Sequence, residues 1–225
     1  VDDLDWAFFA ANMVVFGGTG LVPQLHDSLD RMLPLARSKG AFTVVNTVYD
    51  FRHQRQNPHA RWPLGNSDAS YPAIDLLIAD LEEALRLSGT DTLDDALAFF
   101  MAKGVGAAVV TNGSHDVALR IGSDRYRPCA HSRLPVSQAI VAELAAHPER
   151  KGDTTGCGDN FAGGVIAEVA RQLESGQAQI DLAEAIAWGA VSGGLACFQM
   201  GGVFYESHPG QKRALLLPYL KAYHS

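Results

Sequence analysis

A glycine-rich stretch that runs directly into an apolar-periodic segment constrains this chain more than any other feature. It spans residues 152–164, with the sequence GDTTGCGDNFAGG, and continues into the apolar run 165–173. Small residues where a loop meets a helix start let several backbone N–H groups converge on one anion, because no Cβ atoms stand in the way. The stretch therefore predicts a phosphate-binding loop at the N-terminus of a helix.

Two acids bracket this loop, and we expect them to have different roles. Asp153 precedes Gly156 and Gly158, and Asp159 falls in the first turn of the expected helix. A carboxylate in that turn can take a proton from an attacking hydroxyl, while the helix dipole and the amides stabilise the transferred group. An acid at a helix start can also be only a cap. No Lys-Ser or Lys-Thr pair follows the glycines, so the stretch is not a Walker A loop.

The string DTTGCGDNF resembles the second signature of the ribokinase-like (PfkB) carbohydrate kinases, D-T-x-G-A-G-D-x-F, with Cys157 in the usual Ala position. The resemblance implies a kinase that uses ATP and Mg²⁺ to phosphorylate a hydroxyl of a sugar or sugar-like molecule. It makes Asp159 the general base, and it assigns an anion hole to the N–H groups of Gly156, Cys157 and Gly158. It assigns Thr154 and Thr155 to the nucleotide.

Strand and helix patterns alternate along the chain. Strands are predicted at 13–16, 41–45, 74–78 and 106–110, and helical spacing recurs at 25–35, 91–103 and 182–198. Such alternation is typical of a parallel sheet with helices on its faces, where ligands bind at the carboxyl ends of the strands. We expect a single α/β domain over residues 1–225, with a mostly parallel, ribokinase-like sheet sandwiched between helices. We also expect the end of a helix at 5–12, a loop at 53–70, and a hairpin of 115–121 with 125–129.

Polar residues follow the predicted strands at 41–45 and 74–78. Asn46, Asp50 and Arg52 loosely resemble the substrate-side segment of the family, and a solvated loop is the alternative. Asp80 and Glu83 have capping-box spacing. They also occupy the position of the family's N-x-x-E motif, which organises Mg²⁺, with Asp where Asn is usual; the two roles are compatible.

Other segments resemble the nucleotide side of the family. Asn112 and Gly113 lie in a turn similar to its V-V-T-x-G turn. Small residues in 182–198, among them Gly189 and Ser192, predict close packing or close approach to a ligand. The resemblance implies that this helix lies against the adenine. The family's monovalent-cation loop lies beside the first acid of the signature, here Asp153. The loop 197–202 lacks the family's T-R/K-x-G-A motif. Whether the protein uses K⁺ as a cofactor therefore stays open.

The composition favours small-molecule chemistry. The 225 residues carry a net charge of −7 and no basic run, which argues against a nucleic-acid partner. Neither an apolar run of transmembrane length nor a signal peptide is evident, so we expect no membrane partner and a cytoplasmic protein with reduced cysteines. We expect a lowered pKa for Cys157 at the helix N-terminus. The eight histidines lack zinc-site spacing, and His26, His53 and His208 are interpreted as surface residues.

Parts of the family pattern are not visible before Val1, namely the first strand, a G-G-x-x-x-N sugar-binding segment and a β lid that often forms a homodimer. The chain is therefore either a portion of a longer protein or a shortened relative that has lost sugar binding. Two alternatives to a sugar kinase stay open. One is a non-catalytic nucleotide-binding regulator, and the other is a nucleoside or vitamin kinase of the same fold.

Overall fold

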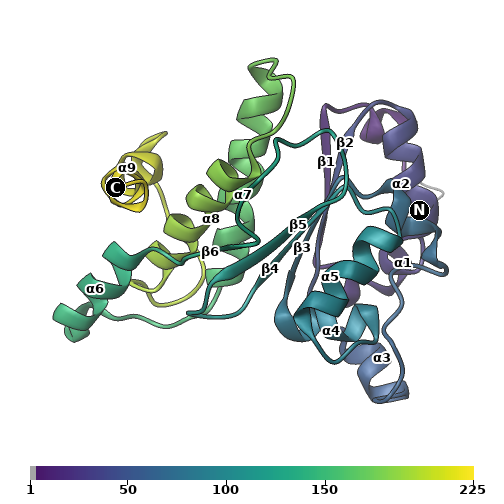
Figure 1. Ribbon diagram of the computed structural model, residues 1–225, viewed down its shortest axis with the longest axis horizontal. Helices are drawn as coiled ribbons and strands as arrows, with labels where there is room; N and C mark the ends of the chain where they lie inside the picture. Colours follow the sequence, from purple (N-terminus) through teal and green to yellow (C-terminus); the bar gives the residue numbers. More distant parts are fainter. Residues whose placement is uncertain (1–3) are drawn as a thin grey trace. The chain divides into compact units, whose positions relative to one another are not determined.

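The computed structural model describes residues 4–225, which form two compact units (Figure 1). The first unit comprises residues 4–112 and 118–125, and the second comprises residues 113–117 and 126–225. Each is described by itself. Within residues 4–225, no helix combines the length and the apolar character that crossing a membrane requires.

A predominantly parallel sheet forms the centre of the first unit. Its neighbouring strands follow the chain order: β1 (Met13–Gly17), β2 (Phe42–Asn46), β3 (Leu76–Asp80), β4 (Ala107–Thr111) and the antiparallel β5 (Val117–Ile121). Gly17 pairs with Asn46 and Asp80 pairs with Thr111, so the segments that leave these strands emerge along one edge. That edge is where open α/β sheets bind ligands.

Helices lie on and beside this sheet. They are α1 (Pro23–His26), α2 (Leu29–Ser38), α3 (Phe51–Gln56), α4 (Leu81–Ser88) and α5 (Leu93–Ala102), with 3₁₀ turns η1 (Trp6–Phe9), η2 (Thr19–Leu21) and η3 (Asp68–Ala73). The core includes Leu33, Val45, Leu77 and Phe100, all almost completely removed from water. Burial of these side chains is the main favourable term in the folding of this unit.

The second unit is built mainly from helices. It contains β6 (Arg133–Leu134), α6 (Gln138–Ala146), η4 (Pro148–Arg150), α7 (Cys157–Glu174), α8 (Leu182–Ala196) and α9 (Gln211–Tyr223). An apolar cluster joins α6, α8 and α9 through Ile140, Val191, Leu195, Leu216 and Leu220. Figure 1 shows α7 and α8 as long neighbouring helices in green and yellow-green.

Glycines allow α7 and α8 to approach closely. A Cβ added at Gly189 would lie 2.6 Å from Val165 Cγ2 and 2.9 Å from the carbonyl oxygen of Phe161. A Cβ added at Gly164 would lie 2.7 Å from the carbonyl oxygen of Trp188. Atoms do not pack at such distances, so the small residues predicted in 182–198 have a packing reason here.

The expected alternation and parallel sheet are confirmed, and several local predictions are wrong. Strand β3 begins two residues later than the predicted 74–78. The predicted loop 53–70 contains most of α3 and the start of η3, because Asp50 and Ser67 cap these short helices. The predicted helix end at 5–12 is a 3₁₀ turn.

The predicted hairpin is also wrong. Strand β5 pairs with β4 rather than with 125–129, and Tyr126 forms an isolated bridge with Ile180. The apolar residues of 117–121 extend the sheet that β4 already belongs to, and pairing there buries them.

A matched pair of glycine substitutions tests the α7–α8 contact. Gly189→Ala should lower the free energy of unfolding by about 1–3 kcal/mol, because its methyl group overlaps Val165. Gly163→Ala in α7 meets nothing within 4 Å and should raise it by about 0.5–1 kcal/mol, because alanine favours a helix. Urea unfolding of both variants measures the difference, and equal effects of the two would contradict this account.

Candidate functional site

The predicted phosphate-binding loop ends at the N-terminus of α7. Gly156 is the N-cap in the left-handed conformation, with φ 72° and ψ 5°. A Cβ added there would lie 2.5 Å from the Cα of Gly202, so both the backbone and the neighbouring loop require glycine. Gly158, in the first turn, is exposed and faces open space. The first N–H groups of a helix have no intrahelical partner, so this end can receive an anion.

Asp159 is exposed in the first turn of α7, where the sequence predicts it. Its carboxylate therefore belongs to the same helix end as the amides that have no partner within the helix. The three amides expected to form the anion hole are not equivalent. The N–H of Cys157 donates to the carbonyl oxygen of Thr154 at 3.2 Å, and it could bind an anion only after that bond lengthens.

Asp153 and Gly152 hold the loop against residues 199–202. The carboxylate of Asp153 accepts from the N–H of Thr155 at 3.0 Å and from the N–H of Gly201 at 3.2 Å. Its backbone N–H donates to the carbonyl oxygen of Gln199, and a Cβ added at Gly152 would lie only 1.9 Å from that oxygen. Asp153 thus has a structural function in this loop, and its assignment to a cation stays a prediction.

Two residues that sequence reasoning missed complete this arrangement. The Asn160 side-chain amide donates to the carbonyl oxygens of Gly156 and Gly202, at 2.8 and 2.9 Å. The Lys212 ammonium, from α9, donates to Asn160 Oδ1 at 2.6 Å, and burial lowers the pKa of Lys212. Asn160 occupies the free position of D-x-F, so the motif carries no signal for it. Lys212 is too distant in sequence to be associated with the loop.

Cys157 lies beside a second cysteine rather than alone. Its Sγ is 3.3 Å from Sγ of Cys197, at the end of α8. Burial, reinforced by the neighbouring thiol, raises the pKa of Cys157 to about 12. The expectation of a lowered pKa is therefore wrong, because loss of hydration and the second thiol outweigh the helix dipole.

At the sheet edge of the first unit, Asp80 and Glu83 form the predicted capping box. Asp80 Oδ1 accepts from the N–H of Glu83 at 2.8 Å, and Glu83 Oε2 accepts from the N–H of Asp80 at 3.1 Å. Thr47 Oγ1 also donates to Glu83 Oε2, at 2.5 Å. Burial raises the pKa of Glu83. The capping role is confirmed, and the metal role stays a prediction.

The predicted substrate-side residues differ in their surroundings. Asn46 ends β2 at the sheet edge and is half-buried. Asp50 is buried as the N-cap of α3, and Arg52 pairs with Asp27, which raises the pKa of Arg52 and lowers that of Asp27. The side chains of Asp50 and Arg52 thus both interact with other groups of the chain.

The predicted nucleotide residues lie in both units. Asn112 follows β4, and Gly113 is exposed with φ 56°. Gly189 and Ser192 are buried in α8, where Gly189 packs against α7. Thr154 and Thr155 are exposed in the signature loop.

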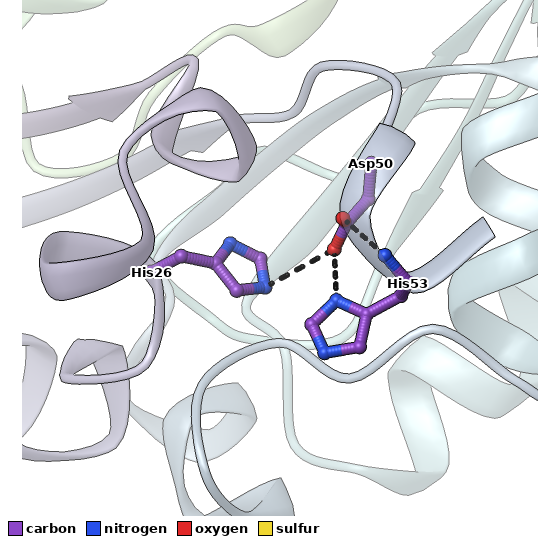
Figure 2. Close-up of side chains that lie close together, drawn as sticks. All are labelled: His26, Asp50 and His53. Atoms are coloured by element: carbon purple, nitrogen blue, oxygen red, sulfur yellow. Dashed lines mark hydrogen bonds and ion pairs between the residues drawn. The ribbon is translucent and has the colours of Figure 1, made fainter. Parts of the chain in front are cut away.

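His26 is not a surface residue, which corrects the sequence interpretation. Only 4% of its surface is exposed, because α1 folds over the first core and its ring contacts Thr19 and Pro63. It lies near Asp50 and the less buried His53 (Figure 2). These residues are separated by 24 positions or more from His26, so no local motif predicts the cluster.

A parallel sheet with polar strand ends, and a glycine loop that presents amides and an acid at a helix N-terminus, define an α/β protein suited to phosphate groups. The family model of the pfkB family carbohydrate kinases matches residues 2–207. The chain belongs to this family. Among curated proteins, no significant match was found.

Solved structures share the fold at low sequence identity. Adenosine kinase from Sinorhizobium meliloti is 21% identical, with a TM-score of 0.65 over 95% of this chain and 57% of its own. Ribokinase from Thermotoga maritima is 16% identical, with a TM-score of 0.63 over 98% and 60%. Fructokinase from Vibrio cholerae O395 is 18% identical, with a TM-score of 0.59 over 92% and 59%. The ribokinase-like fold is therefore confirmed, and the chain spans about 60% of the length of these structures.

Replacing Glu83 by Gln should remove a pH dependence of stability while keeping the cap. Burial raises the folded-state pKa above its ordinary 4.5, so the folded protein keeps a proton that the unfolded chain has released. The free energy of unfolding of the wild type should therefore fall as pH rises through this window, and that of Glu83→Gln should not. Urea unfolding between about pH 4 and pH 8 measures it. The exposed neighbour variant Glu82→Gln serves as the control and should retain the fall.

The two close cysteines should form a disulfide under mild oxidation. One thiolate attacks oxidised glutathione and releases glutathione, and the other cysteine then displaces the second glutathione, so two thiols become one disulfide. The rate should rise with pH, because the raised pKa of Cys157 limits its thiolate. Peptide mass spectrometry should find Cys157 joined to Cys197. Cys129→Ser should leave this product unchanged, and a mixed population of pairings would contradict the expectation.

Proposed function

We propose that the protein containing this chain is an ATP-dependent kinase that transfers the γ-phosphoryl group to a hydroxyl of a sugar or sugar-like small molecule. The observation that carries the proposal is the exposed carboxylate of Asp159 in the first turn of α7, three residues after the left-handed Gly156 cap. Family membership supports phosphoryl transfer as the reaction. The identity of the acceptor molecule is a further part of the proposal.

Each part of the loop has a role in this reaction. Asp159 takes the proton from the acceptor hydroxyl as the oxygen attacks phosphorus. The N–H groups of Gly156, Cys157 and Gly158, with the positive end of the α7 dipole, stabilise the charge on the transferred group. Phosphoryl transfer needs little covalent participation from the protein, so positioning and electrostatics account for most of the catalysis. The residues proposed to hold the nucleotide are Asn112, Gly113, Thr154, Thr155, Gly189 and Ser192.

Asp80, Glu83 and Asp153 are the proposed metal-side residues. The capping box uses Oδ1 of Asp80 and Oε2 of Glu83, which leaves the second oxygen of each carboxylate outside it. Carboxylate oxygens are the ligands that Mg²⁺ prefers, so the donor set fits. When bound, Mg²⁺ neutralises charge on the phosphates. One matched structure from E. coli is a complex with ATP and Mg²⁺, and the Vibrio cholerae fructokinase holds fructose, ADP and calcium. K⁺ is a second ion that we propose to test as a cofactor.

Asn46, Asp50 and Arg52 are the proposed substrate-side residues. Because one matched structure is an adenosine kinase and another a fructokinase, sugars and nucleosides both belong among the acceptors tested. The net charge of −7 supports a small-molecule rather than a nucleic-acid partner. We place residues 1–225 in one ribokinase-like domain. We also propose that the protein is cytoplasmic and that it forms a homodimer.

The deciding experiment measures ADP release from MgATP by the full-length protein with sugars, sugar acids and nucleosides, with and without K⁺. Turnover with one acceptor class supports the kinase and names its substrate class. Absence of turnover with every acceptor, together with retained ATP binding, would replace the kinase by a non-catalytic nucleotide-binding regulator.

Replacing Asp159 by Asn should lower kcat by about 10²–10⁴-fold, because the variant cannot accept the hydroxyl proton. The melting temperature and ATP affinity should stay near those of the wild type, since Asp159 is exposed. Glu174→Gln removes an exposed carboxylate from the last turn of the same helix and is the matched control. Equal turnover by Asp159→Asn and the control would exclude Asp159 as the base.

A further inference from the structure

We propose that His26, Asp50 and His53 form a binding site for one divalent transition-metal ion of the Zn²⁺ type. One ligand-type atom from each residue lies within 4.8 Å of the other two. Figure 2 shows both imidazole rings directed at the same carboxylate. His26 Nε2 is 3.7 Å from Asp50 Oδ2, and His53 Nδ1 is 2.5 Å from the same oxygen. This site contains none of the residues proposed to hold Mg²⁺, and it shares Asp50 with the proposed substrate side.

The three residues come from segments that follow neighbouring strands. His26 ends α1 in the connection after β1, and Asp50 and His53 belong to the start of α3, after β2. The side chains of His26 and Asp50 are about 5% exposed, and that of His53 is 24% exposed. The core fixes two of the groups, and the third reaches the surface. An ion could therefore enter from the side of His53.

The environment of His26 favours the form that binds a metal. Its Nδ1 lies 3.3 Å from Thr19 Oγ1, so the tautomer with hydrogen on Nδ1 can donate there and leave the Nε2 lone pair for an ion. The carbonyl oxygen of Pro63 lies 3.1 Å from Nε2, so an ion bound at Nε2 has an oxygen atom nearby. Without an ion, the other tautomer donates from Nε2 to that oxygen. Burial lowers the pKa of His26, which keeps the ring neutral.

The distances from His26 Nε2 and His53 Nδ1 to their neighbouring oxygen atoms can be compared with those of a bound ion. Two ligands at about 2.0–2.1 Å from a tetrahedral ion are about 3.3–3.4 Å apart. The distances from His26 Nε2 to Asp50 Oδ2 and to the Pro63 oxygen, 3.7 and 3.1 Å, bracket that value. The separation of His53 Nδ1 from Asp50 Oδ2 must open from 2.5 Å. The partly exposed His53 ring can make this movement by rotating about its own side-chain bonds.

The donor set selects the class of ion. Two imidazole nitrogens with one carboxylate suit Zn²⁺ and its neighbours Co²⁺ and Ni²⁺, whereas Mg²⁺ prefers oxygen ligands. Bound there, the ion would join the connection after β1 to the loop after β2. The Arg52–Asp27 ion pair already links the same two segments. The ion therefore has a structural role at the edge of the sheet, and its binding should raise the thermal stability.

The test uses the full-length protein, freed of metal with a chelator and titrated with Zn²⁺ in a calorimeter. We expect one equivalent of Zn²⁺ and a melting temperature that rises with its concentration. Co²⁺ should give the visible absorption of a four-coordinate site, and Zn²⁺ should displace it. Excess Mg²⁺ should not displace the bound Co²⁺.

Variants separate this site from adventitious binding. His26→Gln and His53→Gln each remove a ligand, and each should weaken Zn²⁺ binding by more than about 100-fold. Thr19→Val keeps the ligands but removes the hydroxyl beside His26 Nδ1, and it should weaken binding by about 10–100-fold. His115→Gln and His208→Gln replace exposed histidines and should bind as the wild type does.

His53→Gln guards against variants that merely unfold, because His53 is partly exposed, and circular dichroism of the metal-free proteins checks each fold. Absence of a stoichiometric Zn²⁺ site in the wild type would overturn the proposal. So would Zn²⁺ binding that His26→Gln and His53→Gln leave unchanged. In either case the cluster is a hydrogen-bonded network without an ion.

Discussion

The close contact between the signature loop and residues 199–202 determines the shape of the candidate phosphate site. Gly152 approaches the carbonyl oxygen of Gln199, and Gly156 approaches Gly202, at distances that no side chain tolerates. The Asp153 carboxylate and the Asn160 amide then bond across the same contact. Because the Asp153 carboxylate and the side-chain N–H groups of Asn160 bond to backbone atoms there, the loop that leads into α7 is held in place before any ligand arrives. Such preorganisation is what electrostatic catalysis requires.

Much of this could be predicted from sequence, because glycine spacing and apolar periodicity are local signals. The strand–helix alternation, the helix start after Gly156 and the Asp80–Glu83 cap all follow from residues within one or two turns. What failed depends on distant partners. Burial, reinforced by Cys197 forty residues away, raises the pKa of Cys157, and His26 is buried by contacts with Thr19 and Pro63. Short helices in 51–73 were missed because caps, not periodicity, define them.

The polar groups along the sheet edge of the first unit divide into two sets with different physical constraints. Glu83 and Thr47 are fixed by direct bonds to each other and to the start of α4. His26, Asp50 and His53 instead share one carboxylate between two rings, so their arrangement depends on where protons reside. The first set stabilises a helix start. The second set, which we propose as a metal site, can exchange protons for an ion. The same sheet edge thus holds a fixed helix cap and a group of side chains that can change its bound protons.

Helix α9 has a consequence for how the boundaries of this domain are drawn. The family pattern ends at residue 207, yet Lys212 lies beyond it and donates to Asn160 beneath the signature loop. Leu216 and Leu220 also belong to the apolar cluster of the second unit. A fragment cut at the end of the recognisable pattern would therefore lose an ammonium group and two core side chains. The physical unit that supports the candidate phosphate-binding loop is longer than the unit that sequence similarity delimits.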